Sequence, residues 1–209
     1  MARSRTLNQK HSLTQDIHEY GINFDTREIF LHSHYSSEEE SGVDYRSAVK
    51  FQKNLSILNS FSSSDITVNM HIIGGHWHDG MAMYDCINIS KSPVTIKGFG
   101  HVGSMSSIVL QAGTKRLLSA SCEFLVHFGS IGLETNSMAA KSMIEWNEKC
   151  NSVMLDIYSQ RCQGSQAFES KPVSYIKNYI KTKIKNTQEW FMTAEEAIHY
   201  GFADGIIEE

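Results

Sequence analysis

The sequence lacks the signals of a membrane, exported or disulfide-linked protein. No apolar run approaches the roughly 20 residues that a membrane-spanning helix needs, and residues 1–10 contain no apolar segment of the kind found in secretory signals. The four cysteines lie far apart without a C-x-x-C pair, which argues against a zinc cage and a disulfide framework. We therefore expect a cytoplasmic protein with reduced thiols, no metal and no membrane contact.

An excess of charge of one sign is also missing. The formal net charge is −4 at pH 7 and charged residues make up 20% of the chain, so composition gives no argument for a nucleic-acid partner. Five lysines gather between residues 171 and 185, but no aromatic residues accompany them at the spacing of stacked bases. We interpret this run as the solvated face of a helix.

The length and the hydrophobic content fit one domain. A chain of 209 residues, 41% of them hydrophobic, can bury one sizeable core, whereas two domains would each be small. Residues 1–20 are polar, of mixed charge and without a hydrophobic period, so we interpret them as an N-terminal arm. The single domain then occupies residues 21–209.

Strand-like and helix-like segments alternate along this domain. Strands are predicted at residues 26–34, 66–73, 94–97 and 122–128, and helices at residues 44–58, 80–89 and 173–185, with others beginning near residues 104, 136 and 194. The alternation predicts an α/β architecture with mostly parallel strands. The helix that begins near residue 136 is long, and its apolar residues follow one face: Met143, Trp146, Cys150, Val153, Met154 and Ile157.

Three turns carry candidates for chemistry. Gly74-Gly75 follows a strand and can expose backbone N–H groups without a Cβ in the way. Ser104 begins a helix, where free N–H groups and the positive end of the helix dipole favour a developing negative charge. His127 ends a strand, and an imidazole can take the proton of a serine. Taken singly, each also fits a plain role as turn glycine, helix cap or core histidine.

Two other patterns in the same region are weaker. Gly98, Gly100 and Gly103 match G-x-G-x-x-G, but Glu123, twenty residues on, starts its predicted strand, whereas a ribose-binding acid should end it. We therefore expect no dinucleotide cofactor. Four histidines also cluster here without a carboxylate at helical spacing, Asp79 being merely adjacent, and we interpret them as surface or rim residues: His71, His76, His78 and His101.

Four blocks of residues, in this order and with matching separations, resemble the proteolytic subunit of the Clp protease. They are Gly74-Gly75 with residues 80–85, Gly103-Ser104-Met105 with residues 110–113, residues 124–127, and residues 191–204. The similarity runs from about Ile22 to Ile207 and is strongest to the shorter, divergent members found in phages and mobile elements. It implies an α/β ClpP/crotonase-like superhelix of βαβ units with a long protruding helix.

The resemblance also implies roles for particular residues. By position, Ser104 is the nucleophile, His127 is the general base, and the backbone N–H groups of Gly75 and Met105 form the oxyanion hole. Glu189 stands where most relatives have the aspartate that orients the histidine. The implied protein is a serine endopeptidase that acts on polypeptides inside a homo-oligomeric ring, which in the family is often a doubled heptamer, with an ATPase unfoldase as a candidate partner.

The sequence departs from the family pattern in places that keep a second function open. Ile72-Ile73 replaces a proline before the glycine pair, and residues 128–133 replace the proline- and glycine-rich strand that would pair with substrate. A catalytically impaired ring with a scaffold or capsid-maturation role is therefore the alternative. An enoyl-CoA hydratase-like enzyme is disfavoured, because that chemistry needs an oxyanion hole but no Ser–His pair.

Overall fold

The computed structural model describes residues 7–32, 35–36, 39–40, 42–132 and 134–208. Its helical elements are α1 (Leu7–Gln15), η1 (Asp16–Tyr20), α2 (Tyr45–Phe61), α3 (Trp77–Asn88), α4 (Met105–Leu110), α5 (Ser137–Arg161), η2 (Gln166–Phe168), α6 (Val173–Thr187) and α7 (Ala194–Tyr200). Its strands are β1 (Ile22–Asn23), β2 (Glu28–His32), β3 (Tyr35–Ser36), β4 (Glu39–Glu40), β5 (Ile66–His71), β6 (Val94–Gly98), β7 (His101–Gly103), β8 (Lys115–Leu118), β9 (Glu123–His127), β10 (Glu189–Thr193) and β11 (Gly205–Ile206).

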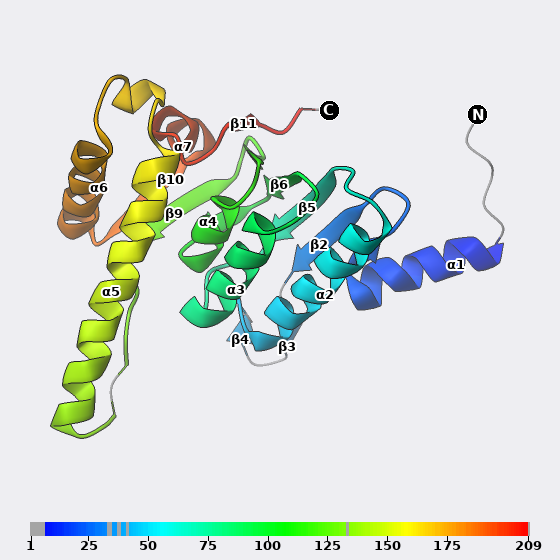
Figure 1. Cartoon of the computed structure of the whole chain (residues 1–209), viewed down its shortest axis with the longest axis horizontal. Coiled ribbons are helices and arrows are strands. Elements are labelled where there is room, and N and C mark those ends of the chain that lie inside the picture. Colours follow the sequence, from blue (N-terminus) through cyan, green and yellow to red (C-terminus); the bar gives the residue numbers. More distant parts are fainter. Residues whose placement is uncertain (1–6, 33–34, 37–38, 41, 133, 209) are drawn as a thin grey trace.

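Two sheets organise the fold. The larger has the strand order β1-β2-β5-β6-β8-β11 and is parallel from β2 onward, while the smaller has the order β10-β9-β7. Helices α2, α3 and α4 lie along one face of the larger sheet, and α5, α6 and α7 gather around the smaller one (Figure 1). The predicted α/β architecture of βαβ units is confirmed.

Local sequence signals explain where several helices begin and end. The Asp44 carboxylate accepts a hydrogen bond from the Ser47 N–H (2.7 Å), and the Ser47 hydroxyl accepts one from the Asp44 N–H (2.9 Å). Thr193 and Glu196 form the same reciprocal pair at the start of α7, and Gly201 ends that helix in the left-handed conformation. Each of these capping pairs joins residues three apart in the sequence, so a short local pattern specifies where the helix begins.

Other expectations about the elements need correction. Helix α3 begins at Trp77 rather than near residue 80, and the turn predicted at residues 98–103 contains the short strand β7. Tyr45, in the first turn of α2, follows the spacing of the buried residues Ala48, Phe51 and Leu55 but is itself 71% exposed. Residues 7–20 are helical, whereas the division into an arm and one domain stays a prediction.

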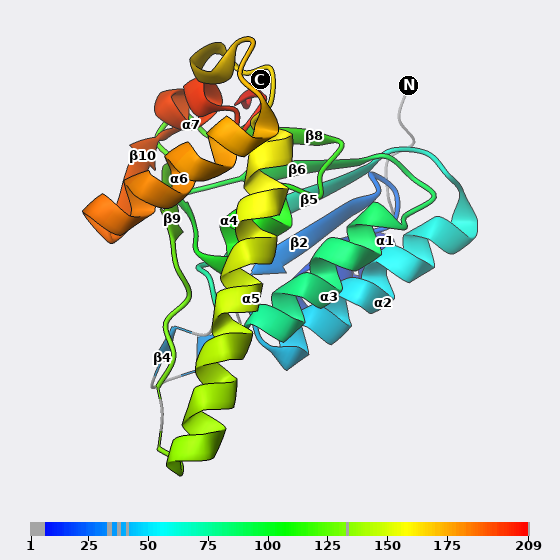
Figure 2. The ribbon, with the colours of Figure 1, turned by 60° about the vertical axis from the view of Figure 1, so that its left-hand side comes forward.

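Helix α5 is the long helix that the sequence predicts, and it protrudes from the body of the molecule (Figure 2). Its second half is buried against α6 and α4, with Cys150, Met154 and Ile157 in the core. Its first half leaves Trp146 and Met143 exposed although they continue the same apolar face. Among the described helices, none is both long and apolar enough to span a membrane.

Candidate active site

Ser104 lies at a strained corner between β7 and α4. Its φ of 54° and ψ of −126° are rare for a residue with a side chain, and such a conformation costs about 1–3 kcal/mol that neighbouring bonds must offset. Its N–H donates to the Leu125 carbonyl (3.0 Å), and its carbonyl accepts from the Ser107 N–H (3.1 Å). The Ser104 hydroxyl makes no capping bond to α4, so it is not the helix cap of the plain interpretation.

Buried hydrogen bonds hold this corner, defined here as residues 103–107. The Ser106 hydroxyl bridges both backbone groups of Gly103, at 3.0 Å to its nitrogen and 2.8 Å to its oxygen. The Ser107 hydroxyl lies 2.7 Å from the Tyr158 hydroxyl on α5. Burial raises the pKa of Tyr158, so the phenol stays protonated and keeps this bond. The corner is therefore anchored to the long helix.

Gly74 makes the closest approach to the serine. A Cβ built on Gly74 would lie 2.3 Å from the Ser104 Cβ, 2.7 Å from its Oγ and 2.9 Å from the Met105 nitrogen. Only glycine fits at this distance, since real Cβ atoms do not approach other heavy atoms so closely. Sequence reasoning singled out the neighbouring Gly75 and missed this contact, although the adjacent pair of glycines was the available signal.

The Gly75 N–H points away from Val43, the residue whose backbone hydrogen bonds hold the loop around Gly75. Val43 donates its N–H to the Gly74 carbonyl (2.8 Å) and accepts from the His76 N–H (2.8 Å), which makes a parallel bridge centred on Gly75. In such a bridge the central residue turns its own N–H to the opposite side. Within the described residues, neither this N–H nor the Met105 N–H in the first turn of α4 has an acceptor.

His127 and Glu189 face each other across the smaller sheet. They are register partners in the antiparallel pair of β9 and β10. Because Leu125 turns its carbonyl toward β7, alternation makes His127 and Glu189 a non-hydrogen-bonded pair, whose Cα atoms lie about 4.5 Å apart with side chains on one face. Among the described residues, however, the imidazole of His127 makes no hydrogen bond to Glu189 or to the Ser104 hydroxyl.

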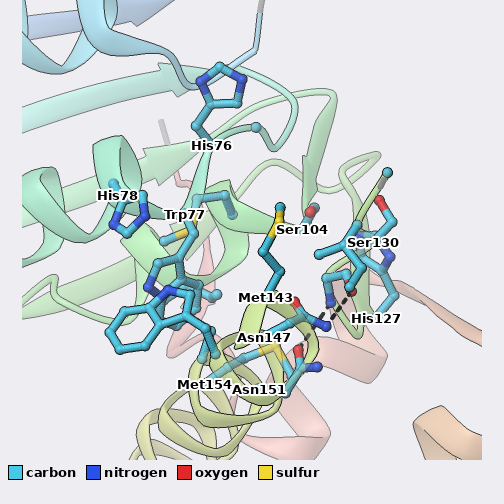
Figure 3. Close-up of a pocket in the computed structure, with 18 of the residues that line it drawn as sticks. His76, Trp77, His78, Ser104, His127, Ser130, Met143, Asn147, Asn151 and Met154 are labelled. Carbon is cyan, nitrogen blue, oxygen red and sulfur yellow. Dashed lines mark hydrogen bonds between the residues drawn. The ribbon is translucent and has the colours of Figure 1, made fainter. Parts of the chain in front are cut away.

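One cavity of about 840 Å³ is lined by Gly75, Ser104, Met105 and His127, whereas Glu189 does not line it (Figure 3). Ser104 and His127 both line it, so their side chains are not on opposite faces of the sheet. Most of its wall is apolar and comes from α3, α4 and α5: Trp77, Met105, Ile108, Met143, Trp146, Cys150 and Met154. Burial raises the pKa of the Cys150 thiol, so it stays protonated and does not compete as a nucleophile.

The other sequence patterns resolve into ordinary contacts. His76 lies 3.3 Å from the Asp79 carboxylate, and the His78 ring stacks on Trp146 with centroids 6.4 Å apart. Glu123 is the first residue of β9, as predicted. Its carboxylate lies 2.8 Å from the His101 ring and is paired with it. In the described part of the chain, no three His, Cys, Asp or Glu side chains are grouped as metal ligands would be.

Comparisons with known proteins agree on one family. The family model described as Clp protease matches residues 15–209. The ATP-dependent Clp protease proteolytic subunit of Deinococcus radiodurans is 26% identical over 147 residues, which cover 69% of this chain and 66% of that protein. The subunit of the same name from Ligilactobacillus salivarius is 29% identical over 153 residues, 70% of this chain and 68% of that protein.

The fold is also similar to a solved structure. A mutant of ClpP1 from Listeria monocytogenes matches 89% of this chain and 94% of its own with a TM-score of 0.70, at 20% sequence identity. The chain matches about two thirds of the length of the curated relatives but nearly the whole of this structure. At that identity the likeness to the solved structure concerns the fold alone.

Proposed function

The chain belongs to the Clp protease family of serine-type peptidases, and we propose that it hydrolyses peptide bonds with Ser104 as nucleophile, His127 as general base and Glu189 orienting the imidazole. The observation that carries the proposal is the Ser104 corner. It presents a hydroxyl without a capping bond, on a strained backbone, to the cavity that His127 also lines.

The oxyanion hole would consist of the N–H groups of Gly75 and Met105. Both lack acceptors in the described part of the chain, and the contact distances from Gly74 place this loop against the serine and the Met105 nitrogen. A tetrahedral intermediate formed on Ser104 would carry its negative charge beside the start of α4. Loss of one such donor typically costs about 100- to 1,000-fold in kcat.

The serine, histidine and glutamate would come into contact when substrate binds. Catalytic hydrogen bonds are often long in unliganded enzymes and tighten in the Michaelis complex. The register of β9 and β10 supports this step, because it holds Glu189 on the same face of the sheet as His127. His127 would take the Ser104 proton during attack and return it to the leaving amine.

We also infer the setting in which this activity operates. Extended polypeptides are the substrates, and a homo-oligomeric ring in the cytoplasm is the active form, with an ATPase unfoldase as a partner. The names of the relatives, proteolytic subunits of an ATP-dependent protease, support a partner that uses ATP. The exposed apolar half of α5 supports an assembly that covers it.

An active-site probe tests the proposal. A fluorophosphonate should label the assembled wild-type protein and the Ser121→Ala variant, which changes an exposed serine away from Ser104, but not Ser104→Ala. Absence of labelling in the wild type would favour the second candidate, a ring that has lost activity and serves as a scaffold or in capsid maturation. This candidate is kept because, among the described residues, His127 has no hydrogen bond to Ser104 or to Glu189.

A further inference from the structure

Two asparagines on α5 hold the two peptide groups on either side of Gly129, two residues after the histidine strand. The Gly129 N–H donates to the Asn151 Oδ1 (3.1 Å), and the Gly129 carbonyl accepts from the Asn147 Nδ2 (3.3 Å). Asn147 and Asn151 are one helical turn apart and therefore present their amides on the same face of α5. Asn147, Asn151 and Gly129 all line the cavity that contains Ser104. The dashed lines at Asn147 and Asn151 in Figure 3 mark their hydrogen bonds.

The edge of β9 next to the serine is the one that Leu125 uses, since its carbonyl accepts from the Ser104 N–H. Every second residue along an extended strand repeats this orientation. Strand β9 ends at His127, and an extended, substrate-paired continuation of the strand would place Gly129, four residues beyond Leu125, on the same edge. Strand β7, which pairs with this edge, stops at Gly103 because the chain turns into α4 at Ser104.

The side chains of Asn147 and Asn151 therefore occupy the position in which a further strand would form hydrogen bonds with Gly129. A residue on a paired strand offers one carbonyl and one N–H to its opposite neighbour, and the Asn151 oxygen and the Asn147 nitrogen offer the same two groups. Gly129 is exposed, so water can replace these bonds and each contributes only modestly to stability. The segment after β9 runs beside α5 toward the start of that helix (Figure 2).

We propose that Asn147 and Asn151 form a removable cap on the β9 edge, which an extended polypeptide must displace before it pairs with Gly129 beside Ser104. This inference rests on the proposed function, because it names the step by which that site admits its substrate. The cap discriminates by length. A peptide long enough to reach Gly129 competes with the asparagines, whereas a short ester that occupies only the region around Ser104 does not meet them.

Isosteric substitutions of the two asparagines separate a cap from other roles. Asn147→Asp removes the N–H donor and sets a carboxylate against the Gly129 carbonyl, which breaks the cap. Asn151→Asp still accepts from the Gly129 N–H and keeps its half of the cap. Both variants add one negative charge on the same helix face, so a general effect of charge is equal in the two.

The measurement is the affinity of a long fluorescent peptide for each variant on the Ser104→Ala background, where no turnover occurs. We expect Asn147→Asp to bind roughly tenfold more tightly than the parent, since the Asn147–Gly129 hydrogen bond no longer competes, and Asn151→Asp to bind no more tightly than the parent. Equal or weaker binding by Asn147→Asp would overturn the cap. Binding is read without catalysis, so this result is independent of whether the fluorophosphonate labels Ser104.

A kinetic arm distinguishes the cap from a role in holding His127. With Ser104 present, Asn147→Asp and Asn151→Asp should hydrolyse a short ester at the same rate and differ only in KM for the long peptide. If Asn147→Asp instead lowers kcat for the short ester more than Asn151→Asp does, the asparagines position the histidine and the cap is rejected.

Discussion

The two halves of the site are held very differently. On the nucleophile side, the Ser104 corner is fixed by buried bonds to α5 through Tyr158 and, through Gln111, to the far end of the chain. On the base side, His127 and Glu189 have no hydrogen bond to each other, and the next peptide is held only by side chains at the protein surface. Under the proposed mechanism, this contrast would make Ser104 a preorganised nucleophile and His127 a base whose contacts are completed on substrate binding.

The rigid side rests on a buried polar network behind α4. Gln111 donates to the carbonyls of Ser107 (2.9 Å) and Phe202 (3.1 Å), and the Arg116 guanidinium donates to the Gln111 side chain (2.6 Å). Arg116 is itself paired with Asp204, which accepts from its backbone N–H (2.7 Å) and from its guanidinium. The side chains of Gln111, Arg116 and Asp204 all have hydrogen-bond partners, so the network resists displacement of the Ser104 corner.

The largest effect should come from removing the base. His127→Ala leaves the serine without a proton acceptor, so kcat for a small peptide should fall about 1,000- to 10,000-fold. His127 is only half-buried at the end of β9, so assembly and thermal stability should change little. Peptidase assays and native mass measurement check both parts. Unchanged turnover would remove His127 from the mechanism.

A single methyl group on the rigid side should be the next most damaging change. Gly74→Ala puts a Cβ 2.3 Å from the Ser104 Cβ, so the corner must move, and a displacement near 1 Å costs on the order of 100-fold in rate. Gly129→Ala, whose added Cβ meets nothing closer than 3.4 Å, is the control on the loose side. Peptidase rates of the two variants test the comparison directly. Equal losses would show that the corner is no more constrained than the segment after β9.

Asp204→Asn should weaken the polar network behind the Ser104 corner, and it should lower the stability of the protein rather than the rate of the chemical step. Burial alone would raise the pKa of Asp204, but the hydrogen bonds and charge of Arg116 outweigh it and lower the pKa. We expect the free energy of unfolding to fall by about 2 kcal/mol at pH 7. Breaking a fully buried pair costs about 3–5 kcal/mol, and the loss here is smaller because the Asp204 side chain is 35% exposed.

The pH dependence of the unfolding free energy of this variant tests the role of the Asp204 charge. A carboxyl group whose folded pKa is lowered stabilises the protein fully above its unfolded value near 3.9, and the contribution is lost as pH falls through the folded pKa. The difference in unfolding free energy between wild type and Asp204→Asn should therefore shrink below about pH 4. Urea titrations at pH 7 and at acidic pH measure it. A constant difference would mean that Asp204 contributes through packing alone.

The sequence predicts the features that depend on residues close together along the chain, and it misses those that depend on distant residues. The helices α2, α6 and α7 depend on residues within a few turns of one another, and the sequence predicts all three. Strand β8 was missed because Arg116, a charged residue, is buried in it, and only Asp204, far along the chain, makes that burial favourable. The apolar first half of α5 was predicted as a buried face, yet the single chain leaves it exposed.

The site divides in the same way. Ser104 and His127 could be singled out because each ends or begins a periodic segment, and the cavity brings both together, while their roles stay predictions. The contact of Gly74 with the serine and the bonds of Asn147 and Asn151 to Gly129 could not be predicted, because they join segments whose approach depends on the whole fold.

The smallest expected effect belongs to Glu189, the least constrained of the proposed catalytic residues. Glu189→Gln keeps the shape but removes the charge that would stabilise the imidazolium, and in tightly held triads the loss of the acid costs about 10,000-fold. Here Glu189 is exposed and not bonded to His127, so we expect only a roughly tenfold loss in kcat, since an exposed charge is screened. Peptidase rates at low and high salt measure it, and the wild-type advantage should narrow at high salt. A loss near 10,000-fold that salt leaves unchanged would show that the base side is as preorganised as the serine.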